Sequence, residues 1–106
     1  MSGYISNDGA QLVTTGGQFA TPVAASTATD TVIKASPGRL CRVVVTATGA
    51  NPMSIWDNAS GHTGTIIGQL PASPAVGSVF DFNLPAANGI TVQGSATNPG
   101  VTIGYN

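Results

Sequence analysis

From residue 29 onward, apolar and polar residues alternate in short runs that are separated by turn residues. Because successive side chains of a β-strand point to opposite faces, each alternating run predicts a strand with one apolar face. No segment carries the apolar period and the capping residues that are typical of a helix. The runs that predict strands are 30–35, 39–48, 53–57, 65–70, 78–84, 90–93 and 101–105.

Strands rich in Val, Ile, Thr and Phe at this regular spacing indicate a β-sandwich or a β-barrel. Residues 11–15 are a candidate for an eighth strand. Eight strands favour a jelly roll, whereas seven would suit an immunoglobulin-like sandwich, whose Cys…Trp…Cys signature is absent from this sequence. We therefore predict an all-β, antiparallel two-sheet sandwich, jelly-roll-like, over residues 29–106.

The alternation also predicts which side chains fill the space between the sheets. Thr91 and Gln93 are expected on the outside of their strand. Cys41 lies in an apolar stripe and is interpreted as a small core residue. The side chains expected to point inward include Val43, Val45, Phe80, Phe82, Leu84, Ile90, Val92, Val101, Ile103 and Tyr105.

The first 28 residues have a different character, with many Gly, Ser, Thr and Ala residues and only scattered apolar ones. We interpret residues 1–28 as an extended N-terminal arm that gains order on a neighbouring subunit or another partner. A frayed tail is the alternative interpretation. The apolar residues that could anchor such an arm are Tyr4, Ile5, Leu12, Val13 and Phe19.

Charge is scarce in this chain of 106 residues: only 7% are charged, with three basic residues, four aspartates and no glutamate. A surface with net charge near zero promotes association, so we expect much of it to be covered by a partner. So few Lys and Arg residues argue against binding to a nucleic-acid backbone. The length predicts one domain.

Features that the sequence lacks argue against several further classes of protein. A single cysteine excludes an intrachain disulfide framework and a multi-cysteine zinc site. No run of eighteen apolar residues predicts a membrane span, and the N-terminus has no signal-peptide pattern. We therefore expect folding in the cytoplasm and no membrane partner.

The stretch MSIWDNASGHTGTII holds the only tryptophan and the only histidine of the chain. Asp57, His62 and either Ser54 or Ser60 are the residue types of a Ser-His-Asp triad. However, there is no nucleophile elbow, and Asp57 to Gly61 is typical turn chemistry. We predict a loop between two strands, no enzyme activity, and no metal or cofactor site. In the absence of a signal peptide, the Asn-Ala-Ser glycosylation sequon is interpreted as incidental.

Two surface features are candidate partner contacts. If Met53 and Ile55 face the core, Trp56 faces outward, where it could serve a protein interface. The alternatives are that Trp56 caps one end of the core, or that the register is different. Lys34, Arg39 and Arg42 surround the Ser36-Pro37-Gly38 turn and could pair with an acidic partner. We favour a structural role, in which these charges keep the edge soluble and block strand pairing.

TDTVIKASPGRLCRVVV, SIWDNASG, GITVQGS and the terminal VTIGYN resemble small proteins of tailed bacteriophages, and are most similar to jelly-roll capsid decoration, or cement, proteins. The resemblance covers the chain from Ala28 onward and includes no site motif, so no residue's role is transferred. It implies a virion protein on the outer capsid surface that bridges subunits of the major capsid protein and contacts copies of itself. The alternative is a tail-fibre or receptor-binding module that recognises a host glycan, expected as an intertwined trimer with a polar-aromatic groove.

Overall fold

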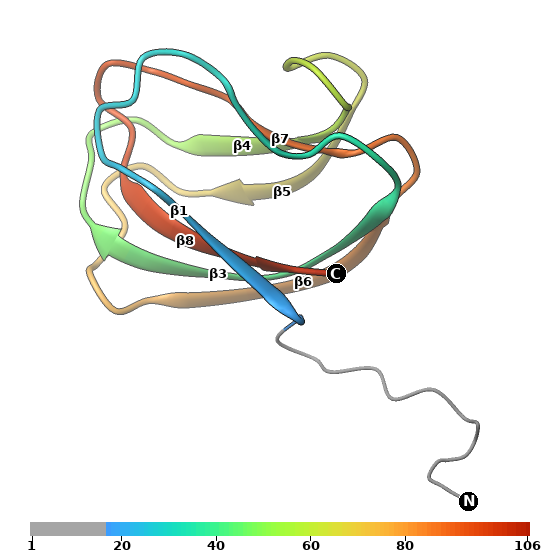
Figure 1. Cartoon of the computed structure of the whole chain (residues 1–106). Coiled ribbons are helices and arrows are strands. Elements are labelled where there is room, and N and C mark those ends of the chain that lie inside the picture. Colours follow the sequence, from blue (N-terminus) through green and yellow to red (C-terminus); the bar gives the residue numbers. More distant parts are fainter. Residues whose placement is uncertain (1–16) are drawn as a thin grey trace, which may run out of the picture.

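The computed structural model of the protein describes residues 17–106. These residues form eight β-strands and no helix, and the strands are stacked in two layers (Figure 1). The strands are β1 (Phe19–Val23), β2 (Thr31–Lys34), β3 (Gly38–Ala47), β4 (Met53–Asp57), β5 (Thr65–Leu70), β6 (Val79–Ala86), β7 (Ile90–Val92) and β8 (Gly100–Tyr105).

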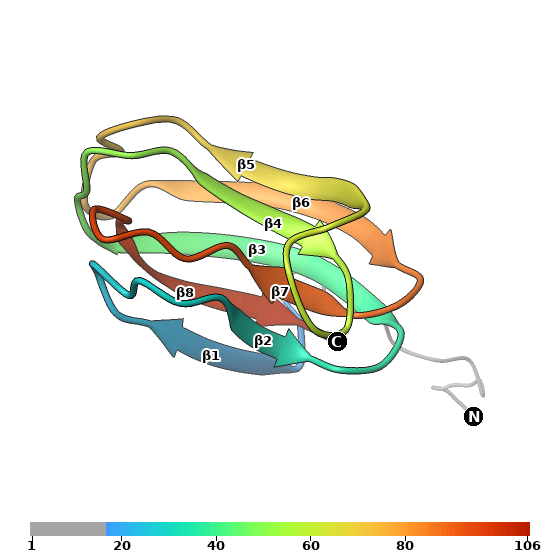
Figure 2. The same ribbon diagram turned by 90° about the horizontal axis from the view of Figure 1, so that it is seen from above.

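The two sheets have the strand orders β1-β8-β3-β6, here sheet A, and β2-β7-β4-β5, here sheet B. Every neighbouring pair is antiparallel. The first strand pairs with the last, the second with the seventh, the third with the sixth and the fourth with the fifth. This is the winding of a long hairpin rolled into two layers, the jelly roll that the sequence predicts (Figure 2).

Strand β1 lies inside the segment that the sequence analysis assigned to an extended arm. Five residues, Phe19 to Val23, pair with Val101 to Tyr105 of β8, so the sandwich begins ten residues before residue 29. Pro22 hides this strand from a sequence-based prediction, because proline is tolerated only at the edge of a sheet. Strand β1 is such an edge. The other candidate strand, residues 11–15, lies outside the described residues.

The core lies between the two sheets and contains buried side chains from seven of the eight strands, and partly buried Ile33 of β2 packs against it. Ile90, Val92, Val101 and Ile103 are buried, as the alternation predicts. The rings of Phe80, Phe82 and Tyr105 are partly buried and pack against the margin of this cluster. The buried cluster consists of Val23, Leu40, Val43, Val45, Met53, Ile55, Ile67, Leu70, Ala86, Ile90, Val92, Val101 and Ile103.

One predicted core position, Leu84, is wrong, because its side chain is 42% exposed. Leu40 pairs with Leu84 and Arg42 with Asp81, so Cys41 faces two residues instead of one. One of these is Asn83, whose φ is 53°. An extra residue breaks the alternation. Cys41, at this bulge, is buried as predicted, with its Sγ 3.7 Å from Asn106 Nδ2, although it lies outside the core cluster.

Candidate functional site

The chain's only tryptophan lies on the outer face of sheet B. Met53 and Ile55 are buried in the core, so Ser54 and Trp56 point away from it, as the sequence predicts. Thr91 of β7 pairs with Trp56 on one side, and Ile66 of β5 pairs with it on the other. Val32 of β2 extends the line beyond Thr91. We call these four residues, Val32, Thr91, Trp56 and Ile66, the tryptophan row.

The β4–β5 loop covers Thr91 of this row. Thr91 is oriented outward, as predicted, but it is fully buried, and its hydroxyl donates a hydrogen bond of 2.8 Å to Asn58 O in the loop. The Asp57 carboxylate accepts hydrogen bonds from the backbone N–H groups of Asn88 and Gly89, at 2.8 and 3.4 Å. The loop is thereby fixed against the turn that precedes β7.

Asn58 organises the loop itself. Its Oδ1 accepts hydrogen bonds from the backbone N–H groups of Ser60 and Gly61, at 2.8 and 2.9 Å. Its Nδ2 donates to Thr63 O at 3.1 Å. The stretch is a loop that joins β4 and β5, which confirms the sequence prediction. The asparagine of the sequon has a structural role as the centre of an Asx turn.

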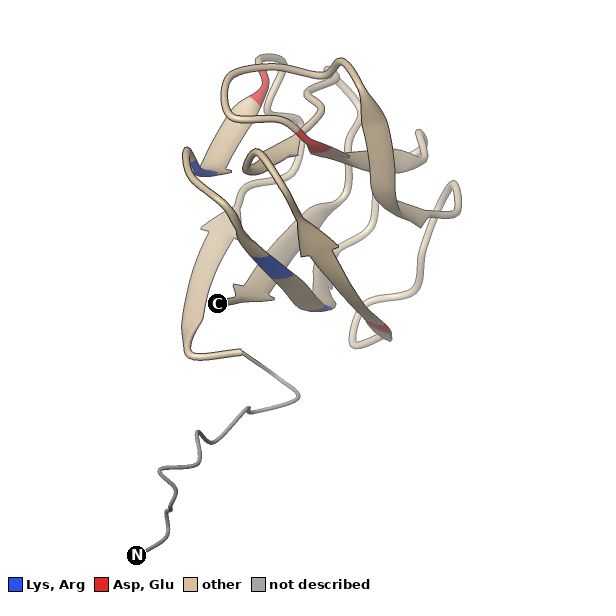
Figure 3. Ribbon diagram, turned by 90° about the vertical axis from the view of Figure 1, so that its right-hand side faces the viewer, with Lys and Arg blue, Asp and Glu red and all other residues tan. Residues whose placement is uncertain are grey.

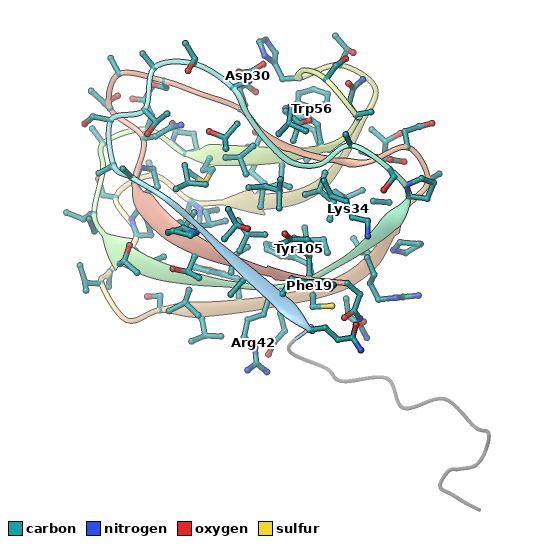
Figure 4. The ribbon with its side chains drawn as sticks, viewed as in Figure 1. Phe19, Asp30, Lys34, Arg42, Trp56 and Tyr105 are labelled. Carbon is teal, nitrogen blue, oxygen red and sulfur yellow. The ribbon has the colours of Figure 1, made fainter. Side chains whose placement is uncertain are left out.

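His62 is not paired with Asp57. Its Nδ1 lies 2.5 Å from Asp30 Oδ2, and its ring centroid lies 6.3 Å from that of Trp56 (Figure 4 shows Asp30 above Trp56). The residue types of the hypothetical triad therefore have separate partners: Asp57 binds backbone amides, and the Ser60 hydroxyl lies 3.3 Å from Asn58 Oδ1. Asp30 was missed by the sequence analysis, because it lies 32 residues from His62 and no local pattern joins them.

Asp30 also joins the β1–β2 loop to the end of β7. Its Oδ1 accepts a hydrogen bond of 2.9 Å from Gly94 N. Partial burial raises the pKa of Asp30, but the hydrogen bonds from Gly94 and His62 outweigh burial and hold the pKa below its ordinary value of 3.8. A Cβ at Gly94 would collide with the backbone of Thr29, so glycine is needed for this close approach.

A hollow of about 210 Å³ lies beside the tryptophan row, where the β3–β4 loop meets the β7–β8 loop. We call it the amide hollow, because three of its lining side chains are amides. None of the lining residues is charged. The lining consists of Asn51, Pro52, Ser54, Gln93, Gly94, Ser95 and Asn98.

Hydrogen bonds hold the lining in place and connect it to Trp56. The indole N–H of Trp56 donates to Gln93 Oε1 at 3.0 Å. Asn51 Nδ2 donates to Ser95 Oγ at 3.0 Å, and Asn98 Nδ2 donates to Gln93 O at 2.8 Å. Asn98 is only 2% exposed, and its side-chain oxygen accepts no hydrogen bond from residues 17–106. Gln93 was predicted to point outward, but no sequence pattern indicated that it lines a hollow with Asn98.

The other predicted contact residues are dispersed. Arg42 Nε forms an exposed ion pair of 2.6 Å with Asp81 on the outside of sheet A, and Arg39 Nη1 donates to Asn83 O at 2.9 Å. Lys34 ends β2 in the other sheet. The two arginines thus hold edge strand β6, which agrees with a structural role.

The predicted arm contacts fall in two groups. Phe19 is 52% exposed, and its ring centroid is 5.6 Å from that of Tyr105, at the open margin of the core (Figure 4). Tyr4, Ile5, Leu12 and Val13 lie outside the described residues.

Within residues 17–106, no group of three or more His, Cys, Asp or Glu side chains is arranged to hold a metal ion. The same residues include no helix that is long and apolar enough to cross a membrane. A comparison with protein-family models, with curated proteins and with solved structures finds no match to this chain.

Proposed function

We propose that this protein is a capsid decoration, or cement, protein of a tailed bacteriophage. It binds an assembled shell and bridges neighbouring subunits of the major capsid protein, without making or breaking a covalent bond. A protein that binds only the assembled lattice stabilises it by mass action, and many copies on one shell add their contacts. The jelly-roll winding and the sequence resemblance support this proposal, but its main support is the character of the sheet edges.

The large exposed apolar side chains are concentrated on the edge strands. Of the six such side chains in the described residues, one lies on β1, one on β2, one on β5 and two on β6. The sixth, Val76, lies in the β5–β6 loop beside them. Exposed apolar groups gathered at edges are typical of surfaces that a partner covers. These side chains are Phe19, Val32, Ile66, Val76, Val79 and Leu84.

The same edges are built to prevent open-ended strand addition. Strand β1 contains Pro22, and β6 contains Pro85 and the bulge at Asn83. The ladders of β2 and β5 are each interrupted by a register shift. Proline, bulges and short strands all disfavour pairing with a further strand. The edges therefore favour recognition through side chains by a partner of fixed shape, as a capsid lattice is.

Scarcity of charge supports the same conclusion. Most of the ribbon in Figure 3 carries neither a basic nor an acidic residue. On the four edge strands, Lys34 and Asp81 are the only charged residues, and Asp81 is already paired with Arg42. A partner can cover these edges with little loss of charge solvation. A surface of this kind suits lasting contact with a shell and with neighbouring copies.

Co-sedimentation with purified capsids tests the proposal. Full-length protein is mixed with shells stripped of small surface proteins, and the bound fraction is measured after centrifugation. We expect saturable binding and a rise in the temperature at which the shells rupture. Val79→Asp places a charge at an apolar edge position and should weaken binding at least tenfold. Ala72→Asp, at an exposed loop position, is the matched control and should bind normally.

The experiment distinguishes a failure of the decoration function from an error in the assigned contact surface. Failure of the full-length protein to bind shells would contradict the decoration function. Equal binding of Val79→Asp and Ala72→Asp would show that the β6 edge is not the contact surface. A third variant, Phe19→Asp, then tests the opposite edge of sheet A, where β1 lies.

A further inference from the structure

We propose that the outer face of sheet B binds a neutral saccharide, with the amide hollow holding one sugar unit and Trp56 flanking it. This site lies on sheet B, whereas Phe19 and Val79 lie on the edges of sheet A. The proposal therefore does not depend on shell binding. A decoration protein attached through sheet A would present this face to the surroundings.

The lining of the amide hollow matches the hydrogen-bonding capacity of sugar hydroxyls. A hydroxyl group both donates and accepts, and amide and serine side chains do the same. Gln93 is held by Trp56 through its Oε1, so its two Nε2 hydrogens point to no partner among the described residues. Asn51 uses its Nδ2 on Ser95, which leaves its oxygen as an acceptor. The hollow thus offers fixed donors and acceptors in close proximity.

Asn98 is the strongest sign that a polar group belongs in the hollow. It is 2% exposed and lines the hollow, while its side-chain oxygen has no donor among residues 17–106. A buried acceptor without a donor is unfavourable, so native proteins rarely leave one unsatisfied. A ligand hydroxyl, or a water that it displaces, would supply the donor.

Trp56 adds the apolar part of the site. Its indole N–H is bonded to Gln93 of the hollow, so the ring edge adjoins the lining. The ring is partly exposed and lies on the outside of the upper layer in Figure 4, with half-exposed Ile66 next to it. An indole combines an apolar face with a polar edge. Sugars have the same combination, because C–H groups cover one side of the ring and hydroxyls surround it.

The volume of the amide hollow and the absence of charge from its lining limit the class of ligand that it can bind. Pockets for drug-sized ligands measure roughly 300–1,000 Å³, and the amide hollow, at about 210 Å³, accommodates one sugar ring of a longer chain. No Lys, Arg, Asp or Glu lines it. The nearest acidic group, Asp30, is occupied by Gly94 N–H and His62. The site therefore selects uncharged units, including N-acetylated ones, over uronic or sialic acids.

A panel of immobilised oligosaccharides, with neutral, N-acetylated and acidic members, is the first probe. The best neutral binder is then titrated into ¹⁵N-labelled full-length protein. Because Trp56 is the only tryptophan, its indole N–H gives a single, unambiguous resonance. We expect saturable shifts of this resonance and of the side-chain amides of Asn51, Gln93 and Asn98.

Three variants locate the site. Gln93→Ala and Asn51→Ala should each weaken saccharide binding at least tenfold. Asn51 is exposed, so its replacement keeps the fold even if Gln93→Ala disturbs the end of β7. Asn88→Ala, which changes an exposed asparagine near the opposite end of β4, is the matched control and should leave affinity unchanged.

Several outcomes would overturn the proposal: no panel member binds, only acidic members bind, or the shifts lie elsewhere on the protein. Equal affinity of the Asn51→Ala and Asn88→Ala variants would also overturn it. Both variants should co-sediment with shells as the unmodified protein does, so a failure of the saccharide site is distinguishable from a failure of the decoration function.

Discussion

Ile103 is fully buried where β8 pairs with β1 on one side and β3 on the other. Shortening it to alanine leaves a cavity in the core, because neighbours on two strands are held by the ladder and relax little. We expect Ile103→Ala to lower the free energy of unfolding by about 2–5 kcal/mol. Leu84→Ala removes an equally large side chain that is 42% exposed, and should cost less than about 1 kcal/mol. Urea unfolding of both variants measures the difference.

Equal costs for the two substitutions would contradict the exposed position of Leu84 on edge strand β6, since Leu84 would then be a core residue. The slope of free energy against urea concentration is the control. It should be the same in both variants if neither changes the extent of unfolding.

Near Trp56, the sequence predicts hydrogen bonds between residues close together in the chain, but not contacts between residues far apart in it. The turn at Asn58 could be predicted, because the hydrogen bonds of the Asn58 side chain are all local. The contact of His62 with Asp30 and the bond between Trp56 and Gln93 could not, because they join positions 32 and 37 residues apart. Such pairs are set by strand order, which alternation does not specify.

At the scale of elements, seven strands could be predicted from alternation because each has one face in the core and the other outside. Alternation does not predict strand positions correctly where the period of two is interrupted. The register shift at Cys41 interrupts the period in β3, and Pro22 obscures β1. The order of strands in the two sheets follows from the eight-strand winding. This winding includes β1, which alternation does not predict.

The position of β1 predicts the effect of N-terminal truncation. A chain that begins at residue 17 retains the β1–β8 pairing and should unfold at nearly the same temperature as the full-length protein. A chain that begins at residue 29 loses the strand, which uncovers one edge of β8 and removes buried Val23 from the core. We expect its melting temperature to fall by more than about 5 °C, measured by circular dichroism.

The comparison of the two truncations also tests whether residues 1–28 act as a single arm. If both were equally stable, β1 would contribute nothing and residues 1–28 would act as a single arm, as the sequence suggested. Shell binding is therefore compared between full-length protein and the chain that begins at residue 17, because only this pair shares the intact sandwich. Weaker binding of the shorter form would support a role for residues 1–16 in attachment.

At the scale of the whole molecule, acid should weaken the connections between loops. The pKa of Asp57 is lowered, first by the hydrogen bond from Asn88 N, and that of Asp30 is also below its ordinary value of 3.8. A carboxyl with a depressed pKa in the folded state contributes its full stability above the unfolded value and loses it as the pH falls through the folded value. We expect a constant melting temperature from pH 7 to about pH 5 and a decline below about pH 4.

Asp57→Asn is the control for this acid transition. The amide oxygen can still accept from Asn88 N, but it does not titrate, so the variant should lose less stability between neutral and acid pH than the unmodified protein. Parallel curves for the two proteins would contradict the assignment of the acid transition to Asp57.

The scarcity of charge predicts how shell binding depends on the salt concentration. If the protein binds shells through its apolar edges, raising the salt concentration from about 0.1 M to about 1 M should leave the bound fraction unchanged or slightly higher. This change shortens the Debye length from about 10 Å to about 3 Å and screens exposed ion pairs, but it does not weaken apolar contacts. Co-sedimentation across this range, with the Val79→Asp variant in parallel, measures the effect. A steep loss of binding by the unmodified protein would instead assign recognition to Lys34, Arg39 and Arg42, and would show that the apolar edges are not the main contact.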